Sequence, residues 1–222
     1  MKHISVYMTG QIPNTFVVEE KTPYEQILNQ KGPICSPEDF GLSTFMSTTA
    51  CRRGYHLTYG IVDGTLYLEK MLLNTKDPKK INGIEPKSTQ NAVKIASGKG
   101  NDQSNKKAWI QKYYNMFQLV YENLHVKPNF TGMVYLGEKI ARGYSIHMGN
   151  QPIWTYEGVL EVVFDKGTVV ESNNVSKTIK KFRKNMGKKP FGPDQSEKKS
   201  EKIKQIKKEI REWLDNRYDK FF

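Results

Sequence analysis

Apolar and polar residues alternate most regularly in residues 54–73. Every second residue is apolar over 55–61, and the alternation resumes over 66–72. The dipeptide Asp63-Gly64 between the two runs provides the positive φ angles that a tight two-residue hairpin turn requires. The pattern therefore predicts a β-hairpin.

Other short runs predict further strands. A second hairpin is expected where residues 154–163 and 168–170 flank the turn Asp165-Lys166-Gly167. The remaining expected strands are residues 4–8 and 15–18, which form a first hairpin across a Gly/Pro/Asn break, and residues 132–136.

Two segments of the body have helical patterns. Thr22-Pro23-Tyr24-Glu25 has the residue types of a capping box, which predicts a short helix over residues 23–30. In residues 104–124 large apolar side chains recur every three or four positions, as on one face of an amphipathic helix. We expect this aromatic stripe to pack in the core rather than to stack against bases. The stripe consists of Trp109, Tyr113, Phe117, Val120 and Leu124.

The C-terminal residues 175–222 contain two more amphipathic patterns, which a Gly- and Pro-containing break over 187–196 separates. The expected fold is α+β: a mainly antiparallel β core of hairpins, one packed amphipathic helix and a basic helical C-terminal tail. Residues 1–174 are expected to form a β-rich globular domain that folds without the tail. Residues 74–104, rich in Lys, Asn, Gly, Pro and Ser, are expected to be a flexible insertion.

Positive charge is concentrated in the tail. The 222 residues carry a formal net charge of +12, and residues 175–222 hold 16 Lys and Arg against 7 Asp and Glu. This asymmetry fits a solvated lysine-rich surface or an anionic partner, either nucleic acid or a nucleotide. Residues 175–189 contain seven basic residues and no acidic one. The predicted nucleic-acid-binding residues are Lys177, Lys180, Lys181, Arg183, Lys184, Lys188 and Lys189.

Composition also limits the location and the chemistry. Two cysteines are too few for a disulfide framework, and no secretory or membrane-spanning apolar stretch occurs, so we expect a cytoplasmic protein with reduced thiols. The four histidines and two cysteines lack metal-site spacing, and no phosphate-binding glycine loop or nucleophile elbow occurs. We therefore expect no metal, no cofactor and no catalytic residue.

Small hydroxyls, a thiol and paired arginines meet in residues 47–55. Paired guanidinium groups can bind phosphate or carboxylate through two parallel hydrogen bonds. Arg52, Arg53 and His147 are the predicted ligand-binding residues, because both segments that hold them are polar and bounded by glycine. The alternative is structural: one arginine pairs with a local acid, and Cys51 is a small buried apolar residue.

Several short motifs in residues 43–170 resemble a family of bacterial proteins without a known activity. This resemblance implies a bacterial or phage source and a compact, mainly-β fold, and it implies no reaction. The chain departs from the family by Arg52 in place of an aromatic residue, by the long insertion and by the basic tail. The motifs are Thr49-Ala50-Cys51-x-Arg53-Gly54-Tyr55, Asp63-Gly64-x-Leu66-Tyr67-Leu68, Phe130-x-Gly132, His147-Met148-Gly149, Tyr156-Glu157 and Phe164-x-x-Gly167-x-Val169.

Two other functions stay open. Ser47-Thr48-Thr49 followed by Glu157 resembles the order of motifs in one class of ADP-ribosyltransferases, which would make the protein an enzyme. A protein-interaction role, as a toxin partner or phage counter-defence protein, would use apolar residues of the last helix, unless those residues pack on the protein's own body. These residues are Ile203, Ile206, Ile210 and Trp213.

Overall fold

The structure is a computed structural model, and it describes residues 11–19, 23–29, 32–90, 114–146, 149–187 and 197–221. The described part contains nine strands, two short 3₁₀ helices and two long α-helices. Their bounds are β1 Thr15–Val18, β2 Tyr24–Asn29, η1 Pro37–Phe40, β3 Tyr55–Val62, β4 Thr65–Leu73, β5 Lys87–Ser88, β6 Leu119–Val126, β7 Gly132–Ile140, η2 Ile153–Thr155, β8 Tyr156–Asp165, β9 Thr168–Asn174, α3 Ser176–Met186 and α4 Glu197–Asp219.

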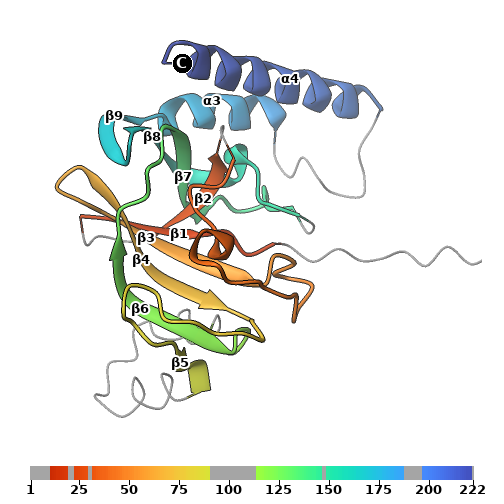
Figure 1. The fold of residues 1–222 in the computed structure, drawn as a ribbon. Coiled ribbons are helices and arrows are strands. Elements are labelled where there is room, and N and C mark those ends of the chain that lie inside the picture. Colours follow the sequence, from red (N-terminus) through yellow and green to blue (C-terminus); the bar gives the residue numbers. More distant parts are fainter. Residues whose placement is uncertain are drawn as a thin grey trace, which may run out of the picture.

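Seven strands close into a barrel in the order β3-β1-β2-β7-β8-β9-β4 (Figure 1). The ring closes because β4 pairs with β3 along its whole length and with β9 at Thr65 and Thr168. From Leu68 onward β4 pairs with β6 instead of β9, and β6 in turn pairs with the two-residue strand β5. The protein is therefore rich in β structure, as predicted, but the predicted architecture of a hairpin core with one packed helix and a helical tail is wrong.

Both long hairpins of the prediction are present. The turn between β3 and β4 has positive φ angles at Asp63 (48°) and Gly64 (69°), and the turn between β8 and β9 has them at Lys166 (46°) and Gly167 (77°). Strands β1 and β7 are confirmed as well. Residues 4–8 lie outside the described residues, and β1 pairs with β2 and, in parallel, with β3.

The helix predicted over residues 104–124 is wrong at its described end, where residues 119–126 form strand β6. Asn123 and His125 have positive φ angles of 57° and 45°, so β6 is irregular and its buried residues do not alternate strictly. Phe117 and Val120 belong to one apolar cluster and Leu124 to the barrel interior, so these three side chains do not share one face as they would on a helix. Their predicted burial is nevertheless confirmed, since each is at most 4 % exposed.

The helix predicted over residues 23–30 is also wrong, because residues 24–29 form β2. This strand joins β1 to β7 and thereby completes the ring of the barrel. The carboxylate of Glu25 accepts a hydrogen bond from the Tyr156 hydroxyl at 2.7 Å instead of closing a capping box. A tertiary interaction has overridden the local helix signal.

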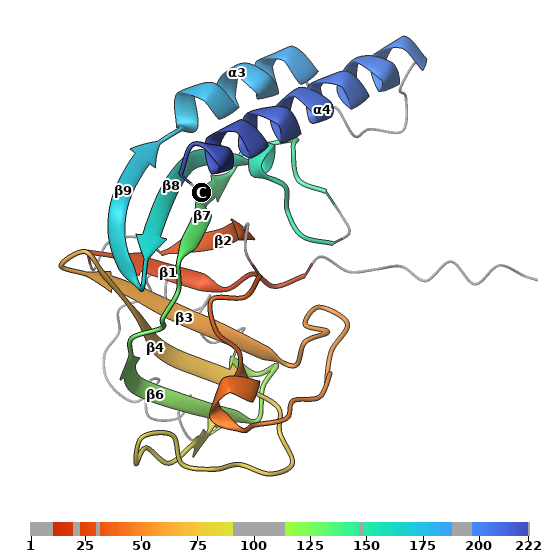
Figure 2. The same cartoon turned by 45° about the horizontal axis from the view of Figure 1, so that its top comes forward.

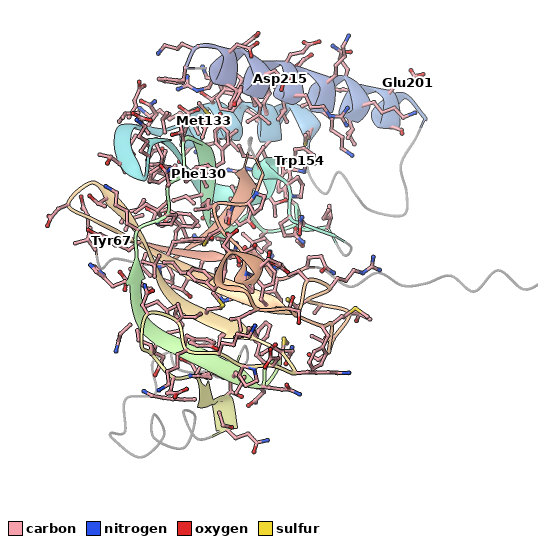
Figure 3. All side chains as sticks on the ribbon, viewed as in Figure 1. Tyr67, Phe130, Met133, Trp154, Glu201 and Asp215 are labelled. Carbon is pink, nitrogen blue, oxygen red and sulfur yellow. The ribbon has the colours of Figure 1, made fainter. Side chains whose placement is uncertain are left out.

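Two of the three apolar clusters among the described residues form the barrel interior and the layer beneath the helices. Side chains from all seven barrel strands fill the interior, among them Phe16, Tyr59, Leu68 and Phe164. A second cluster lies between the outer face of β7 and β8 and the helices α3 and α4, which form a layer over this side of the barrel (Figure 2). Met133 and Trp154 lie on the side of the barrel that faces the helices (Figure 3).

The two C-terminal helices are therefore not a free tail. Ile179 and Met186 of α3 and Ile206, Ile210 and Leu214 of α4 are buried in this second cluster. Neither α3 nor α4 is both long and apolar enough to cross a lipid bilayer.

The described part of the predicted flexible insertion, residues 74–90, packs on the barrel. Ile81 belongs to the interior cluster, and Asn74 and Thr89 are at most 3 % exposed. The amide of Asn74 donates to Ser47 Oγ at 2.8 Å and its Oδ1 accepts from the Gln118 backbone at 3.0 Å. Residues 91–104 of the insertion lie outside the described residues.

Gly54 is required where the loop enters β3. Its φ angle is +75°, and a Cβ atom at this position would lie directly against the backbone carbonyl of Phe45. A left-handed conformation costs an ordinary residue about 1–2 kcal/mol before any clash is counted. We expect Gly54→Ala to lower the free energy of unfolding by at least about 2 kcal/mol in urea denaturation. Gly64→Ala is the matched control, because Gly64 has a similar φ of +69° and open space at Cβ; equal losses would show that the Phe45 contact adds nothing.

Candidate functional site

Helix α3 presents four lysines to solvent on one face. Each of them has two of the others three or four positions away, so the four lie on the same side of the helix. Ile179 and Met186 on the opposite side of the helix are buried in the second cluster. This packing fixes the orientation of α3, so the lysines face solvent. We call this surface the α3 lysine face; it consists of Lys177, Lys180, Lys181 and Lys184, all exposed.

The α3 lysine face lacks compensating acids. Helix α3 contains no Asp or Glu, and none of the four lysines forms an ion pair with a described residue. Each like-charge neighbour three or four positions away destabilises a helix by about 0.2–0.5 kcal/mol. The helix dipole disfavours Lys177 in the first turn and favours Lys184 in the last turn, so these two effects oppose each other and the mutual repulsion of the lysines remains. The arrangement therefore opposes the stability of α3.

Arg183 differs from these lysines. It is only 8 % exposed, and its guanidinium donates to the backbone carbonyl oxygen of Tyr156 and lies 5.8 Å from the ring centre of Tyr144. This arginine holds α3 on the start of β8 and is not available to a ligand at the surface. The predicted residues Lys188 and Lys189 lie outside the described residues.

The two arginines of the other predicted site also differ in exposure. Arg52 is exposed, whereas Arg53 is half-buried and joins β3 to the segment before β1. The Nε of Arg53 donates to the carbonyl oxygen of Tyr55 at 2.8 Å, and Nη2 donates to the carbonyl oxygen of Ile12 at 3.0 Å and to Oδ1 of Asn14 at 2.7 Å. None of these acceptors is an acid. His147 lies outside the described residues, so its distance from the arginines stays untested.

Comparison of the chain with known protein families, with curated proteins and with solved structures found no match. The resemblance to the bacterial family stays a prediction.

The described thiols and histidines offer little for covalent chemistry. Cys51 is 2 % exposed, and burial raises the pKa of its thiol. Burial also lowers the pKa of His56 to about 3, so this imidazole is neutral at physiological pH. Among the described residues, no group of three His, Cys, Asp or Glu side chains could hold a metal ion.

The motifs that resemble an ADP-ribosyltransferase are engaged in local contacts. Ser47 Oγ donates to the carbonyl oxygen of Met116 at 3.0 Å, and Glu157 forms an ion pair at 2.5 Å with Lys139 on the neighbouring strand. In the described part of the chain, no hydrogen bond or ion pair joins Ser47 to Glu157. We find no geometric support for this enzyme class.

The apolar residues proposed for a protein partner are covered by the protein itself. Ile203, Ile206 and Ile210 are at most 4 % exposed. Trp213 is half-buried, with its ring centre 6.2 Å from that of Tyr135 and 6.1 Å from that of Phe182. A partner could reach the three isoleucines only if α4 left the barrel.

Two polar cavities were not found from the sequence. One, of about 760 Å³, lies between the loop before β3 and the segments that flank β5 and β6. The other, of about 270 Å³, lies beside Arg53 and is lined in part by Asn14, Gln26 and Asn150. Isolated amides at such distances along the chain form no motif, so only the folded structure brings them together.

Proposed function

We propose that this protein binds the phosphate backbone of nucleic acid through the α3 lysine face and that it catalyses no reaction. The observation that carries this proposal is a helix face with four exposed lysines, no acid and no described ion pair. Such a face costs the helix stability, and an external anion would neutralise the repulsion. A cytoplasmic location agrees with this proposal and stays a prediction.

A nucleic-acid backbone matches the face better than a single nucleotide does. Lys177 and Lys184 are seven residues apart, so their positions on the helix differ by about 10 Å along its axis. A row of positive charges of this length fits a series of phosphates rather than one phosphate group. Lysine is a flexible point charge without the fork geometry that reads base edges, so little sequence preference is expected.

The variant in which Lys177, Lys180, Lys181 and Lys184 are changed to Gln tests this proposal. Four neutralised phosphates give a slope of about −3.6 in log affinity against log salt for duplex DNA, or about −2.8 for single strands. The wild type should therefore lose about 50-fold to about 150-fold in affinity between 50 and 200 mM salt. We expect the variant to lose most of its binding at 50 mM salt, measured by fluorescence anisotropy with unrelated duplexes and single strands.

A matched control changes four lysines at the opposite end of the molecule, in and after the β4–β5 connection (Figure 1). Three of them form ion pairs there, with Asp77, Glu85 and Glu122. Both variants lower the formal net charge of +12 by four. Equal weakening in both would contradict a site on α3 and leave only an effect of net charge. The control residues are Lys76, Lys79, Lys80 and Lys87.

The same α3 variant should be more stable than the wild type. Removal of the like-charge neighbours should raise the free energy of unfolding by about 1 kcal/mol, which corresponds to a Tm increase of about 2–4 °C for a chain of this size. Gln and Lys have similar helix propensities, so the substitution itself changes little. A gain in stability together with a loss of binding would distinguish a functional surface from a structural one.

A further inference from the structure

The cavity beside Arg53 has no lining residue in α3, so it is a different site from the α3 lysine face. Its volume is about 270 Å³, slightly below the range of about 300–1,000 Å³ that is usual for sites of drug-sized ligands. Its walls come from the segment before β1, from β2, from the start of β3 and from the loop that contains Asn150. A cavity of this size suits a small molecule or one end of a larger molecule.

Arg53 gives this cavity a positive charge that forms no ion pair with a described carboxylate. Its three hydrogen bonds use only Nε and Nη2 and end on two carbonyl oxygens and an amide oxygen. Nη1 takes part in none of these bonds and keeps its two N–H donors. In the described part of the chain, no carboxylate lies within 4 Å of the guanidinium.

A relay of hydrogen bonds from Arg53 orients the amides in the wall. Oδ1 of Asn14 accepts from Arg53 and also from the backbone N–H of Leu57 at 3.1 Å, so this atom must be the oxygen. Nδ2 of Asn14 therefore donates to Oε1 of Gln26, at 2.9 Å. Gln26 consequently keeps its NH₂ group as a donor beside the cavity.

Two further polar side chains of the wall, Tyr55 and Cys35, are uncharged at neutral pH. Burial raises the pKa of Tyr55, and burial raises the pKa of the Cys35 thiol to about 11. Both groups therefore stay protonated, and Cys35 is not a thiolate nucleophile. The cavity is equipped to bind an anion and not to attack it.

We propose that this cavity binds the oxyanion of a small ligand, a carboxylate or a phosphate, through Nη1 of Arg53 and the amide groups of Gln26 and Asn150. Guanidinium and amide donors around one anion form charge-assisted hydrogen bonds, which are about twice as strong as neutral ones. This second site does not depend on the proposed binding of nucleic acid.

The test titrates the full chain with sodium acetate and with methyl phosphate at constant ionic strength, with chloride as the balancing anion. We expect saturable binding of at least one probe by isothermal titration calorimetry, with a Kd on the order of 1 mM. Tighter binding of acetate would identify a carboxylate ligand, and tighter binding of methyl phosphate a phosphate ligand. Absence of saturable binding by both would overturn the proposal.

The decisive variant is Gln26→Glu. One carboxylate oxygen can still accept from Asn14, while the other replaces the NH₂ donor by a negative charge next to Arg53. We expect both probes to bind at least about tenfold more weakly, with an unchanged circular dichroism spectrum. Asn150→Asp, at an exposed position, gives the same test if Gln26→Glu does not fold.

Two controls separate this site from other effects. Gln118→Glu introduces the same charge at an exposed position on the wall of the other cavity and should leave binding unchanged. The α3 variant without its four lysines should bind the probes as the wild type does. Equal loss in Gln118→Glu, or loss in the α3 variant, would overturn the assignment to Arg53.

Discussion

Truncation after Asn174 is expected to abolish the stable folded state. The outer face of β7 and β8 would expose apolar side chains that α3 and α4 now cover, including Met133, Tyr135 and Val163. Full burial of one such side chain stabilises a fold by about 1.5–3 kcal/mol. The truncated chain would also lose Arg217, the partner of the buried Glu161.

The sum of these effects is comparable with the whole stability of a domain. Partial exposure of several large side chains and the loss of a buried ion pair together amount to about 5–10 kcal/mol, against a typical total of about 5–15 kcal/mol. The measurement compares residues 1–174 with the full chain by urea denaturation and by binding of a hydrophobic dye. We expect a poorly soluble product that binds the dye and shows no cooperative unfolding.

The opposite outcome has a clear meaning. A soluble fragment that unfolds cooperatively would confirm the division predicted from the sequence, with residues 1–174 as an independent domain. It would also show that the interior of the barrel alone is sufficient for folding.

The elements that the sequence predicts correctly are those in which local pattern and tertiary environment agree. Residues 55–61 of β3 alternate between apolar and polar or small side chains, and Asp63-Gly64 has the turn geometry that its residue types favour. The closure of the barrel has no such local signal, because it depends on one pairing between Thr65 and Thr168, which are more than 100 residues apart. No periodicity could have revealed it.

The two helix predictions in the body of the protein are wrong for different reasons. Residues 24–29 have a good helix start but fill the gap between β1 and β7, so the sheet determines their conformation. Strand β6 contains positive φ angles at Asn123 and His125, and these shift its buried residues out of alternation. A pattern of period 3.6 and a bulged strand cannot be distinguished over so short a stretch.

The sequence predicts the positive charge of the candidate sites but not which of their basic residues are engaged in internal contacts. The sequence identifies a basic segment, and four of its lysines are exposed as a single face. It does not distinguish Arg183 from them, because only the docking of α3 on β8 makes this arginine a buried donor to the carbonyl oxygen of Tyr156. Likewise the acceptors of Arg53, which are the carbonyl oxygens of Ile12 and Tyr55 and the amide oxygen of Asn14, form no sequence motif.

Removal of the Arg217 side chain is expected to destabilise the protein by about 3–5 kcal/mol, because it leaves a buried carboxylate unpaired. Glu161 is 0 % exposed and accepts hydrogen bonds from Arg217, from the Tyr135 hydroxyl at 2.7 Å and from the Asn173 amide at 3.0 Å. Burial alone would raise the pKa of Glu161, but these donors hold it below its ordinary value. The ion pair joins the end of α4 to β8 on the barrel.

The experiment is a set of Arg217→Met, Glu161→Gln and the double variant, each measured by urea denaturation. Arg217→Met should be the most destabilising, and the double variant should recover at least about 2 kcal/mol of that loss, because Gln is neutral and still accepts from Tyr135. Lys208→Met is the control, since it breaks an exposed pair with Glu212 that contributes less than about 0.5 kcal/mol. An equal loss for Lys208 and Arg217 would contradict the role of burial.

The pH dependence of the free energy of unfolding provides a second, independent measurement on the same variants. Because the pKa of Glu161 is lower in the folded state than in the unfolded chain, its stabilisation is complete above the ordinary carboxyl pKa of about 4.3 and disappears as the pH falls through the folded value. In Arg217→Met, protonation of Glu161 instead removes an unpaired buried charge and so stabilises the fold. This variant should therefore gain stability relative to the wild type as the pH falls from 7 toward about 4.3, and the two curves should converge only below the lowered pKa of Glu161 in the wild type. Parallel curves would mean that Arg217 stabilises α4 by packing on Trp213, 5.7 Å away, and not through its charge.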